Sequence, residues 1–299
     1  MPEAFDYIIV GAGSAGCVLA NRLSEAGKCS VLLLEAGPRD TDPWIHVPLG
    51  YGKLFNKPSV NWSYWSEPEP ELNGRRIFTP RGKVLGGSSS INGLVYTRGQ
   101  PEDFDGWETP GWSFGELLPY FKKSEDQARG GDALHGKGGP LAVSDQREPH
   151  ELCDAFIEAA VQAGHPRNAD FNGAQQEGAG YQQLTARNGL RCSTATGYLK
   201  PALNRPNLKV LTDVLVSRVV FEGFRASGIE FLEGGKKKTV KAAKEVLLSA
   251  GAINSPQLLQ LSGVGPAALL REHGIPMVLD QPNAGEHLQD HFQDRKSVV

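Results

Sequence analysis

The sequence predicts an α/β fold built on a parallel sheet, and three observations near the N-terminus support this. Asp6–Val10 is a short, β-branched and apolar run, which is typical of a buried parallel strand. A glycine-rich turn over residues 11–16 follows, and Cys17–Ala26 then shows the apolar spacing of a helix. Ser30–Leu34 is a second apolar strand, and it ends at Glu35. Strand, turn, helix and strand in this order form one βαβ unit, whose strands run parallel.

The composition favours a globular protein and argues against one that binds nucleic acid. The 299 residues include 31 Lys and Arg against 34 Asp and Glu, so the net charge of −3 offers no basic surplus for a phosphate backbone. Hydrophobic residues make up 39% and charged residues 22%, which is ordinary for a folded protein and argues against disorder. The length suggests two domains of about 150 residues each.

No segment of the sequence is typical of a membrane or secreted protein. The longest apolar runs, such as Tyr7–Val10 and Val246–Leu248, are far too short to span a bilayer. The acidic N-terminus leads straight into a strand and lacks the features of a secretion signal. We expect a cytoplasmic protein, with peripheral attachment to the inner membrane as the alternative.

The number of glycines and the spacing of the cysteines and histidines indicate which kind of ligand site the sequence can form. The chain has 36 glycines, and such an excess indicates tight turns or a backbone that approaches a ligand closely. The four cysteines form no C-x-x-C pair, so we interpret them as reduced thiols. The seven histidines show no H-E-x-x-H pattern. We therefore expect no metal site.

The glycine-rich turn reads G-x-G-x-x-G, which is the spacing of a dinucleotide-binding loop. Gly11 permits the sharp turn, Gly13 lets the backbone approach a pyrophosphate, and Gly16 lets the helix pack on the strand. The helix N-terminus then faces the phosphate charge, and Glu35 can accept a hydrogen bond from a ribose hydroxyl. A purely structural glycine turn is the alternative, and the two flanking strands and the acid disfavour it. The motif does not separate NAD from FAD, but Glu35 disfavours NADP.

A second glycine-rich stretch covers Pro80–Gly93 and favours a loop around a ligand. Its consecutive glycines, Gly86 and Gly87, leave no side chain to block close approach, and Asn92 can both donate and accept hydrogen bonds. A flexible Gly/Ser linker is the alternative. The interleaved apolar residues, of which Ile91 is one, argue against a solvated linker.

A third stretch, Gly251–Gly265, predicts a turn and a helix that follow a buried strand over Glu245–Ser249. We expect Ser255 to cap this helix, with Pro256 at its first position. The pattern alone indicates only strand, turn and helix.

Together these segments resemble the glucose–methanol–choline (GMC) oxidoreductases, a family of FAD enzymes. Gly82–Asp105 is similar to the first signature of the family, and Gly251–Gly265 is similar to the second. The likeness extends from Asp6 to about His291, and its nearest type is the bacterial choline or alcohol dehydrogenase. Further similar stretches are Tyr64-Trp65, Glu67–Pro70, Gly111–Ser113, Leu118–Phe121, Arg187–Gly189 and Gly285–His291.

The resemblance implies a Rossmann-like FAD-binding domain and assigns residues to it. The residues implied to bind FAD are Gly11, Ala12, Gly13, Ser14, Ala15 and Gly16 at the diphosphate, Glu35 and Ala36 at the adenosine ribose, Val84, Gly87, Asn92, Gly93, Leu94 and Val95 along the flavin, and Val216 at the adenine through its backbone. Some members carry a His just before the Asn of the first signature and bond it covalently to the flavin. Ile91 stands at that position here, so we expect a non-covalent FAD.

The resemblance also implies that the FAD-binding and substrate-binding domains are interleaved along the chain. We assign residues 1–144 and 189–293 to the FAD-binding domain and residues 145–188 to an incomplete substrate domain. Residues 294–299 fit no element, and we interpret them as an artefactual tail of a truncated gene model.

Several elements are expected between these boundaries. Pro149–Gly164 predicts an amphipathic helix that begins the substrate domain and has Leu152 and Phe156 on its apolar face. The strands expected after residue 189 are Leu208–Glu222, Arg225–Glu233 and Lys237–Lys241, with the Lys236–Lys238 run at a solvated edge or turn. Asp40–Asn73 is long and rich in Pro and aromatic residues, so we expect an ordered loop that forms a lid near the flavin or contacts a partner subunit.

The resemblance implies oxidation of a primary alcohol, choline-like or aliphatic or aromatic, to the aldehyde by hydride transfer to flavin N5. The family places its catalytic His, paired with a second His or an Asn, near the C-terminus of longer chains, so we name no catalytic residue here. His287 and His291 are expected to be structural. A FAD-containing hydroxynitrile lyase and an inactive FAD-binding fragment are the alternatives. The electron acceptor, whether a quinone, a carrier or oxygen, stays open.

Overall fold

The computed structural model describes residues 3–290, and the chain divides into two compact units. Unit 1 combines Met1–Ala36 with Asn204–Val299, and unit 2 is the continuous stretch Gly37–Leu203. The assignment of residues 145–188 to a substrate domain stays a prediction, because compactness does not show what a segment binds. The expected artefactual tail, residues 294–299, lies outside the described residues.

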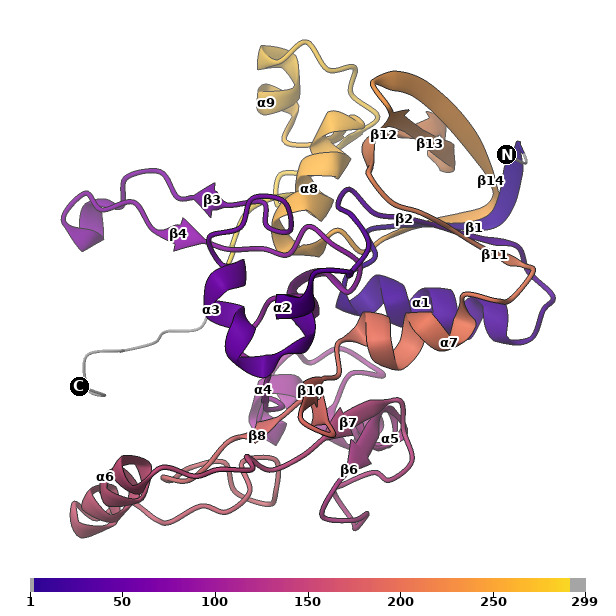
Figure 1. The fold of residues 1–299 in the computed structure, drawn as a ribbon. Coiled ribbons are helices and arrows are strands. Elements are labelled where there is room, and N and C mark those ends of the chain that lie inside the picture. Colours follow the sequence, from indigo (N-terminus) through magenta and orange to yellow (C-terminus); the bar gives the residue numbers. More distant parts are fainter. Residues whose placement is uncertain (1–2, 291–299) are drawn as a thin grey trace. The chain divides into compact units, whose positions relative to one another are not determined.

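Unit 1 is built around a six-stranded sheet in the order β11-β2-β1-β14-β13-β12 (Figure 1). Strands β11, β2, β1 and β14 are parallel neighbours, whereas β14, β13 and β12 form an antiparallel meander. The strands are β1 Ala4–Val10, β2 Val31–Leu34, β11 Leu208–Leu211, β12 Val214–Glu222, β13 Arg225–Glu233 and β14 Lys236–Leu248. The predicted α/β class with a parallel sheet is confirmed.

Helix α1, Ser14–Glu25, links β1 to β2 and packs against both strands. It begins three residues before the predicted start because Ser14, Ala15 and Gly16, the last residues of the turn, already belong to it. Gly16, Cys17 and Ala20 are buried along its length. These small side chains let the helix axis lie close to the sheet, which completes the predicted βαβ unit.

Two predictions about the later strands were wrong, and the pairing partners explain why. The single strand expected over Leu208–Glu222 is two strands, since β11 pairs with β2, Asp213 turns the chain at φ 59°, and β12 pairs with β13. The separate strands expected at Lys237–Lys241 and Glu245–Ser249 are the single strand β14. Its first half pairs with β13 and its second half with β1, so one strand joins the two ladders.

The Lys236–Lys238 run lies at the start of β14, directly after the turn at residues 234–235. It pairs with β13 on one side, whereas the pairing with β1 begins only at Lys241, and its side chains are exposed as expected. Lys237 forms an ion pair with Glu230 at 3.0 Å, and Lys238 forms one with Glu233. Cross-strand pairs of opposite charge support the β13–β14 ladder.

The end of unit 1 contains α8 Gly251–Leu261, α9 Ala267–Glu272 and the short strands β15 Val264–Gly265 and β16 Leu279–Asp280. The predicted cap at Ser255 was wrong, because α8 begins four residues earlier and Pro256 lies inside it. The Ser255 hydroxyl instead accepts a hydrogen bond from the Ala250 N–H at 3.1 Å. Pro256 is the sixth residue of α8, so the helix lacks the hydrogen bond that an N–H at this position would donate to the Ala252 carbonyl.

Unit 2 contains short helices and paired strands in place of a large sheet. Strands β3–β4, β5–β8 and β9–β10 pair antiparallel, and β6–β7 pair in parallel. The helices are α2 Pro43–His46, α3 Tyr51–Leu54, α4 Pro101–Asp105, α5 Phe114–Ser124, α6 Glu151–Gln162 and α7 Lys200–Ala202, with the 3-10 turns η1 Pro48–Gly50, η2 Pro70–Leu72 and η3 Gly87–Ser90 and the π-helical turn η4 Ala195–Leu199. The strands are β3 Tyr64–Trp65, β4 Phe78–Thr79, β5 Val95–Tyr96, β6 Glu125–Gln127, β7 Leu141–Val143, β8 Gln183–Leu184, β9 Ala186–Arg187 and β10 Leu190–Arg191.

The aromatic segment Asp40–Asn73 is ordered, as expected, and it contains α2, α3 and β3. Ile45, Leu54 and Val60 are buried from it, and they form one apolar cluster with Val84 and Ile91. The segment is thus anchored to the second glycine-rich stretch within the same unit. Its role as a lid or as a subunit contact stays a prediction.

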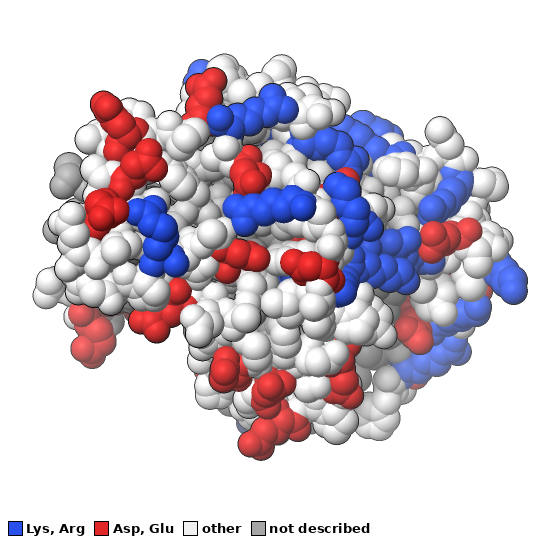
Figure 2. All heavy atoms as spheres, turned by 90° about the horizontal axis from the view of Figure 1, so that it is seen from below, with Lys and Arg blue, Asp and Glu red and all other residues white. Residues whose placement is uncertain are grey.

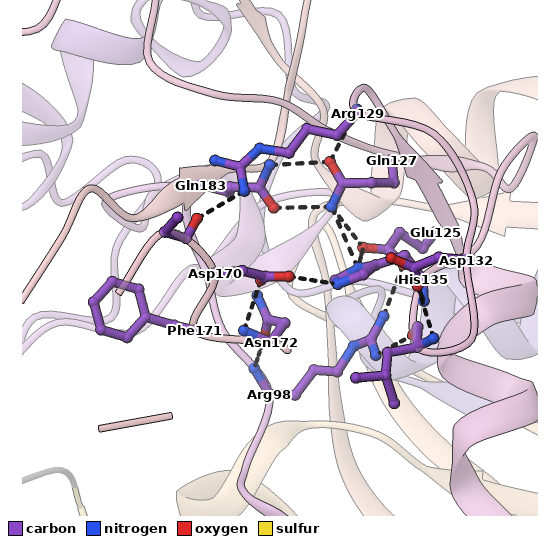
Figure 3. A network of polar contacts seen from close by, with 12 residues as sticks. Arg98, Glu125, Gln127, Arg129, Asp132, His135, Asp170, Phe171, Asn172 and Gln183 are labelled. Atoms are coloured by element: carbon purple, nitrogen blue, oxygen red, sulfur yellow. Dashed lines mark hydrogen bonds and ion pairs between the residues drawn. The ribbon is translucent and has the colours of Figure 1, made fainter. Parts of the chain in front are cut away.

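A buried polar network lies in unit 2 (Figure 3). Arg98 and Glu125 form an ion pair at 2.7 Å, and both side chains are almost completely buried. His135 lies between two carboxylates, with Nδ1 at 3.2 Å from Glu125 and Nε2 at 2.9 Å from Asp170. Gln127 adds a hydrogen bond to Glu125 at 3.2 Å. The network joins β6 to loops that are 27 and 45 residues away in sequence.

Helix α6 agrees with the predicted helix to within two residues at each end, but the expected apolar face is not covered. Leu152 is 70% exposed and Phe156 is 55% exposed, and Ile157 is its one buried residue. The periodicity therefore predicted the position of the helix correctly, but the apolar face it predicted is exposed among the described residues.

The surface carries charges of both signs. On the face drawn in Figure 2, acidic and basic side chains are interspersed over the surface. Among residues 3–290, no helix has both the length and the apolar character needed to cross a membrane. In the same described part of the chain, no group of three or more His, Cys, Asp or Glu side chains is placed to hold a metal ion.

Candidate cofactor site

The predicted site residues fall into two groups, one in each unit. The first group begins with the turn between β1 and α1. Gly11 has φ 95°, its N–H donates to the Leu34 carbonyl at 2.8 Å, and a Cβ there would lie 2.6 Å from the Ser249 carbonyl oxygen. A Cβ on Gly16 would lie only 1.9 Å from the Gly11 carbonyl oxygen. Only glycine fits at either position, because the obstructing atoms belong to the backbone.

The N-terminus of α1 is open to an anion. Gly13 precedes the helix in an extended conformation, no side chain caps it, and the first turn contains no acidic residue. The first N–H groups of a helix have no intrahelical acceptor, and the helix dipole places positive charge at this end. Ser14 and Ala15 are exposed there. These features fit the negative charge of a diphosphate.

Glu35 is held at the end of β2 by three contacts. Its Oε2 accepts from the Ala12 N–H at 2.9 Å, its own N–H donates to Leu211 at 2.9 Å, and its carbonyl accepts from the Val214 N–H at 3.0 Å. The side chain is 5% exposed. The Ala12 N–H therefore helps to fix the Glu35 side chain, and Ala36 follows in a half-buried position.

Val216 lies two residues along β12 from the contact between Val214 and Glu35. It pairs with Phe231, and a β-bulge separates it from Arg218. A bulge interrupts the regular hydrogen bonding of a ladder, which makes backbone groups accessible to other partners. Unit 1 thus brings the glycine turn, Glu35, Ala36 and the start of β12 together at the carboxyl ends of its parallel strands.

The second group begins with Val84 and Gly87 in unit 2. The Val84 side chain is completely buried in the apolar cluster with Ile91, and the Gly87 N–H donates to the Val84 carbonyl at 2.8 Å. A Cβ on Gly82 would lie 2.2 Å from the Gly87 carbonyl carbon. The glycines here let the loop fold tightly on itself, and the Val84 side chain lies within the apolar cluster.

Residues 92–95 form the accessible end of this loop. Asn92 is exposed, Gly93 is half-buried, and Val95 is 51% exposed. Leu94 is buried with φ 65°, a left-handed conformation that is strained for a bulky residue. Such strain persists only where the surroundings impose it and is frequent at ligand sites.

One residue of this region was missed in the sequence. Arg191 on β10 is 2% exposed, and its guanidinium contacts the loop that contains Asn92. Burial lowers the pKa of Arg191 to about 10. The only sequence signal was its position close to the Arg187–Gly189 stretch, because its partners are about 100 residues away.

A glycine-rich turn within a βαβ unit is typical of dinucleotide-binding folds, and the comparison with known proteins identifies the family of this chain. The chain belongs to the GMC oxidoreductases, whose family description matches residues 5–293. It is 49% identical over 294 residues to the alcohol dehydrogenase [acceptor] of Pseudomonas putida, with 96% of this chain and 53% of that protein covered. It is 48% identical over 291 residues to the oxygen-dependent choline dehydrogenase of Sinorhizobium fredii, with the same coverage.

A solved structure agrees with this assignment. Pyridoxine 4-oxidase from Mesorbium loti matches with a TM-score of 0.89 and 39% sequence identity, covering 93% of this chain and 55% of that chain. The predicted family and the Rossmann-like FAD-binding fold are thereby confirmed, and the family is one that binds FAD. The chain spans about half the length of the curated relatives it matches.

Proposed function

We propose that this chain binds FAD non-covalently and belongs to an enzyme that oxidises a primary alcohol to the aldehyde. The observation that supports this most directly is the uncapped N-terminus of α1, reached through glycines that tolerate no side chain, beside a Glu35 fixed by the Ala12 N–H. This combination offers amide donors for a diphosphate and a carboxylate for a ribose at adjacent strand ends.

Each group of residues has one task in this proposal. Residues 11–16 hold the diphosphate, Glu35 accepts from the ribose with Ala36 beside it, and the backbone at Val216 meets the adenine. Val84, Gly87 and residues 92–95 line the flavin. When bound, FAD supplies the acceptor for the hydride that leaves the alcohol carbon.

Non-covalent binding is proposed because Ile91 is a 2% exposed aliphatic residue without a nucleophilic atom. Denaturing the purified protein with acid tests it. We expect the yellow colour in the supernatant, and colour in the washed precipitate would contradict the proposal.

The substrate class and acceptor are inferred from relatives. Two relatives are named as an alcohol dehydrogenase and a choline dehydrogenase. We therefore propose a small alcohol as substrate, which is choline-like, aliphatic or aromatic. The acceptor is a quinone, a carrier or oxygen, and steady-state assays with each distinguish them. We further propose a cytoplasmic location, with peripheral attachment to the inner membrane as the alternative.

The base that removes the hydroxyl proton is proposed to lie outside these 299 residues, because the chain covers only about half of its curated relatives. Sequencing the locus downstream of residue 299 tests this. A genuine stop codon there would contradict it and would favour an inactive FAD-binding fragment.

One experiment tests the redox function. The protein encoded by the complete locus is purified and made anaerobic, choline or benzyl alcohol is added, and the visible absorbance of the bound flavin is followed. Bleaching supports alcohol oxidation. Unchanged colour together with cleavage of a cyanohydrin would favour the lyase alternative, and a colourless preparation that takes up no added FAD would overturn the proposal.

A further inference from the structure

We propose that Arg191 is a positioning residue that fixes the Asn92 side chain so that its amide N–H₂ serves as a hydrogen-bond donor to the flavin. This inference rests on the proposed FAD function. It assigns a task to a buried cation that the family resemblance leaves without one.

The guanidinium of Arg191 makes four hydrogen bonds to neutral oxygens. Nε donates to the Ile45 carbonyl at 2.7 Å and Nη1 to the Ser89 carbonyl at 3.1 Å. Nη1 also donates to Asn92 Oδ1 at 2.7 Å, and Nη2 donates to the Asn92 carbonyl at 2.7 Å. Arg191 therefore binds both the side chain and the backbone of Asn92, and it links them to η3 and to α2.

The contacts determine which way the Asn92 amide faces. Its Oδ1 lies against two groups that can only donate, Arg191 Nη1 at 2.7 Å and the Leu94 N–H at 3.1 Å. An amide nitrogen could not take that place, because it has no lone pair to accept with. The N–H₂ group must then lie on the other side, and among residues 3–290 it donates no hydrogen bond. Asn92 is exposed, so this donor is available to a ligand.

The same contacts explain the strained residue beside it. Leu94 keeps φ 65° while its N–H is bound to Asn92 and its carbonyl accepts from the Thr185 N–H at 2.8 Å. Thr185 lies directly before β9, the strand that pairs with β10 and Arg191. The β9–β10 hairpin thus holds the loop at two points. A strained backbone conformation that costs about 1–3 kcal/mol persists only under such restraint.

Arginine suits this task and lysine does not. Its planar fork directs several N–H groups at fixed angles, whereas an ammonium group is a single point of charge on a flexible stem. Arg191→Lys keeps the positive charge but cannot reach Ile45, Ser89 and both oxygens of Asn92 together. The proposal therefore predicts that geometry matters here and that charge alone does not restore function.

The decisive experiment is a double-mutant cycle with Arg191→Lys and Asn92→Ala. FAD affinity of the apoprotein is measured by quenching of flavin fluorescence, and the visible flavin spectrum is recorded for each variant. We expect each single variant to weaken FAD binding about tenfold and the double variant to be no weaker than Asn92→Ala. Losses that multiply to about a hundredfold would overturn the proposal, because the two residues would then act independently.

A second variant separates the contacts that Arg191 makes with Asn92 from the hydrogen bond that the Asn92 N–H₂ group donates to the flavin. Asn92→Asp keeps an oxygen for Arg191 and the Leu94 N–H but removes the N–H₂ group. We expect the apoprotein to keep its thermal midpoint and its slow amide exchange at residues 92–95, while FAD affinity still falls about tenfold. Unchanged FAD affinity in this variant would overturn the proposal, including where Arg191→Lys fails to fold.

Arg187→Lys is the matched control. Arg187 lies on the neighbouring strand β9, is half-exposed, and pairs with Asp126 at 3.1 Å. We expect its FAD affinity to equal that of the wild type. Wild-type protein that takes up no FAD would overturn the proposed function itself. The role of Arg191 is tested separately by amide exchange in the Arg191→Lys apoprotein. The proposal requires that exchange to be faster at residues 92–95 than in the wild type.

Discussion

At the scale of single residues, the glycine turn is defined by backbone contacts that allow a direct test. In Gly16→Ala the new Cβ would lie 1.9 Å from the Gly11 carbonyl oxygen, so the turn and helix must separate. We expect a loss of about 3 kcal/mol or more in the free energy of unfolding, measured by urea denaturation.

Gly115→Ala serves as the control for this substitution. Gly115 also lies in the first turn of a helix, α5, and nothing lies within 4 Å of the position of its Cβ. We expect a gain of up to about 1 kcal/mol, since alanine favours helix. Equal effects of the two substitutions would show that the Gly16 contact is unimportant.

Glu35 permits a second prediction at this scale. Glu35→Ala leaves the buried Ala12 N–H without its acceptor, and an unsatisfied buried group costs about 1–3 kcal/mol. Glu35→Gln keeps an acceptor for Ala12 and removes the charge. We therefore expect urea denaturation to show a stability loss in the alanine variant alone, while titration with FAD shows weaker binding in both. Full FAD affinity in the glutamine variant would argue against a ribose contact.

Local spacing made some of these residues predictable and others not. Gly11, Gly16 and Glu35 lie within one βαβ unit, where the distance along the chain determines the geometry. Arg191 and Asn92 are 99 residues apart, and the sequence around either residue does not predict their contact. Whether the predicted residues bind FAD stays a prediction until it is measured.

At the scale of elements, the buried network in unit 2 determines how β6 is held. Glu125→Gln would leave the Arg98 guanidinium buried without its carboxylate. Removing one partner of a buried pair costs about 3–5 kcal/mol, and we expect a loss of that size in urea denaturation.

A surface pair provides the comparison. Glu158 and Arg167 are paired at 2.7 Å, and both side chains are more than half exposed. Glu158→Gln should change stability by less than about 1 kcal/mol. If both substitutions had the same small effect, the network would be dispensable for the fold.

Strand β6 also supports a prediction about pH. The Gly138 N–H, and after it Lys137 and Arg187, hold the pKa of Asp126 below its usual value of 3.8. A carboxyl with a depressed folded pKa contributes stability that is present above the unfolded pKa and is lost as the pH falls through the folded pKa. We expect the wild type to lose more stability than Asp126→Asn between about pH 5 and pH 2, as followed by thermal unfolding. Parallel curves for the two proteins would contradict this.

The elements show where pattern reasoning succeeds and where it stops. Strand β13 has the predicted bounds, because apolar and polar residues alternate in a strand covered by two neighbours. Strand β14 was predicted as two pieces, and the sequence does not reveal that β13 pairs with its first half and β1 with its second half. Helix α6 has the predicted period, yet the period does not reveal what covers Leu152 and Phe156.

At the scale of the whole molecule, the chain order does not follow the compact units. Unit 1 is made of two stretches with unit 2 inserted between them. The division into FAD-binding residues 1–144 and 189–293 and substrate-binding residues 145–188 stays a prediction. Every strand of the six-stranded sheet comes from the outer stretches. Two apolar clusters among the described residues also separate, with Ile8, Ile229 and Phe231 in unit 1 and Ile45, Leu54 and Val84 in unit 2.

This separation predicts that unit 1 keeps its sheet when residues 37–203 are replaced by a flexible linker. The linker has to run back along one strand of four residues, roughly 13 Å. About 12 Gly and Ser residues span roughly 20 Å, which is sufficient. We expect a cooperative urea transition and the circular dichroism of a sheet protein, because all the ladder partners and the cluster around Phe231 remain.

Phe231→Ala in the shortened protein shows whether that transition reports on the predicted core. Phe231 is completely buried, and truncating such a side chain costs about 3–5 kcal/mol. We expect the transition to move to lower urea or to vanish. A shortened protein that never unfolds cooperatively, even with its core intact, would mean that the sheet depends on unit 2 and that the two units fold only together.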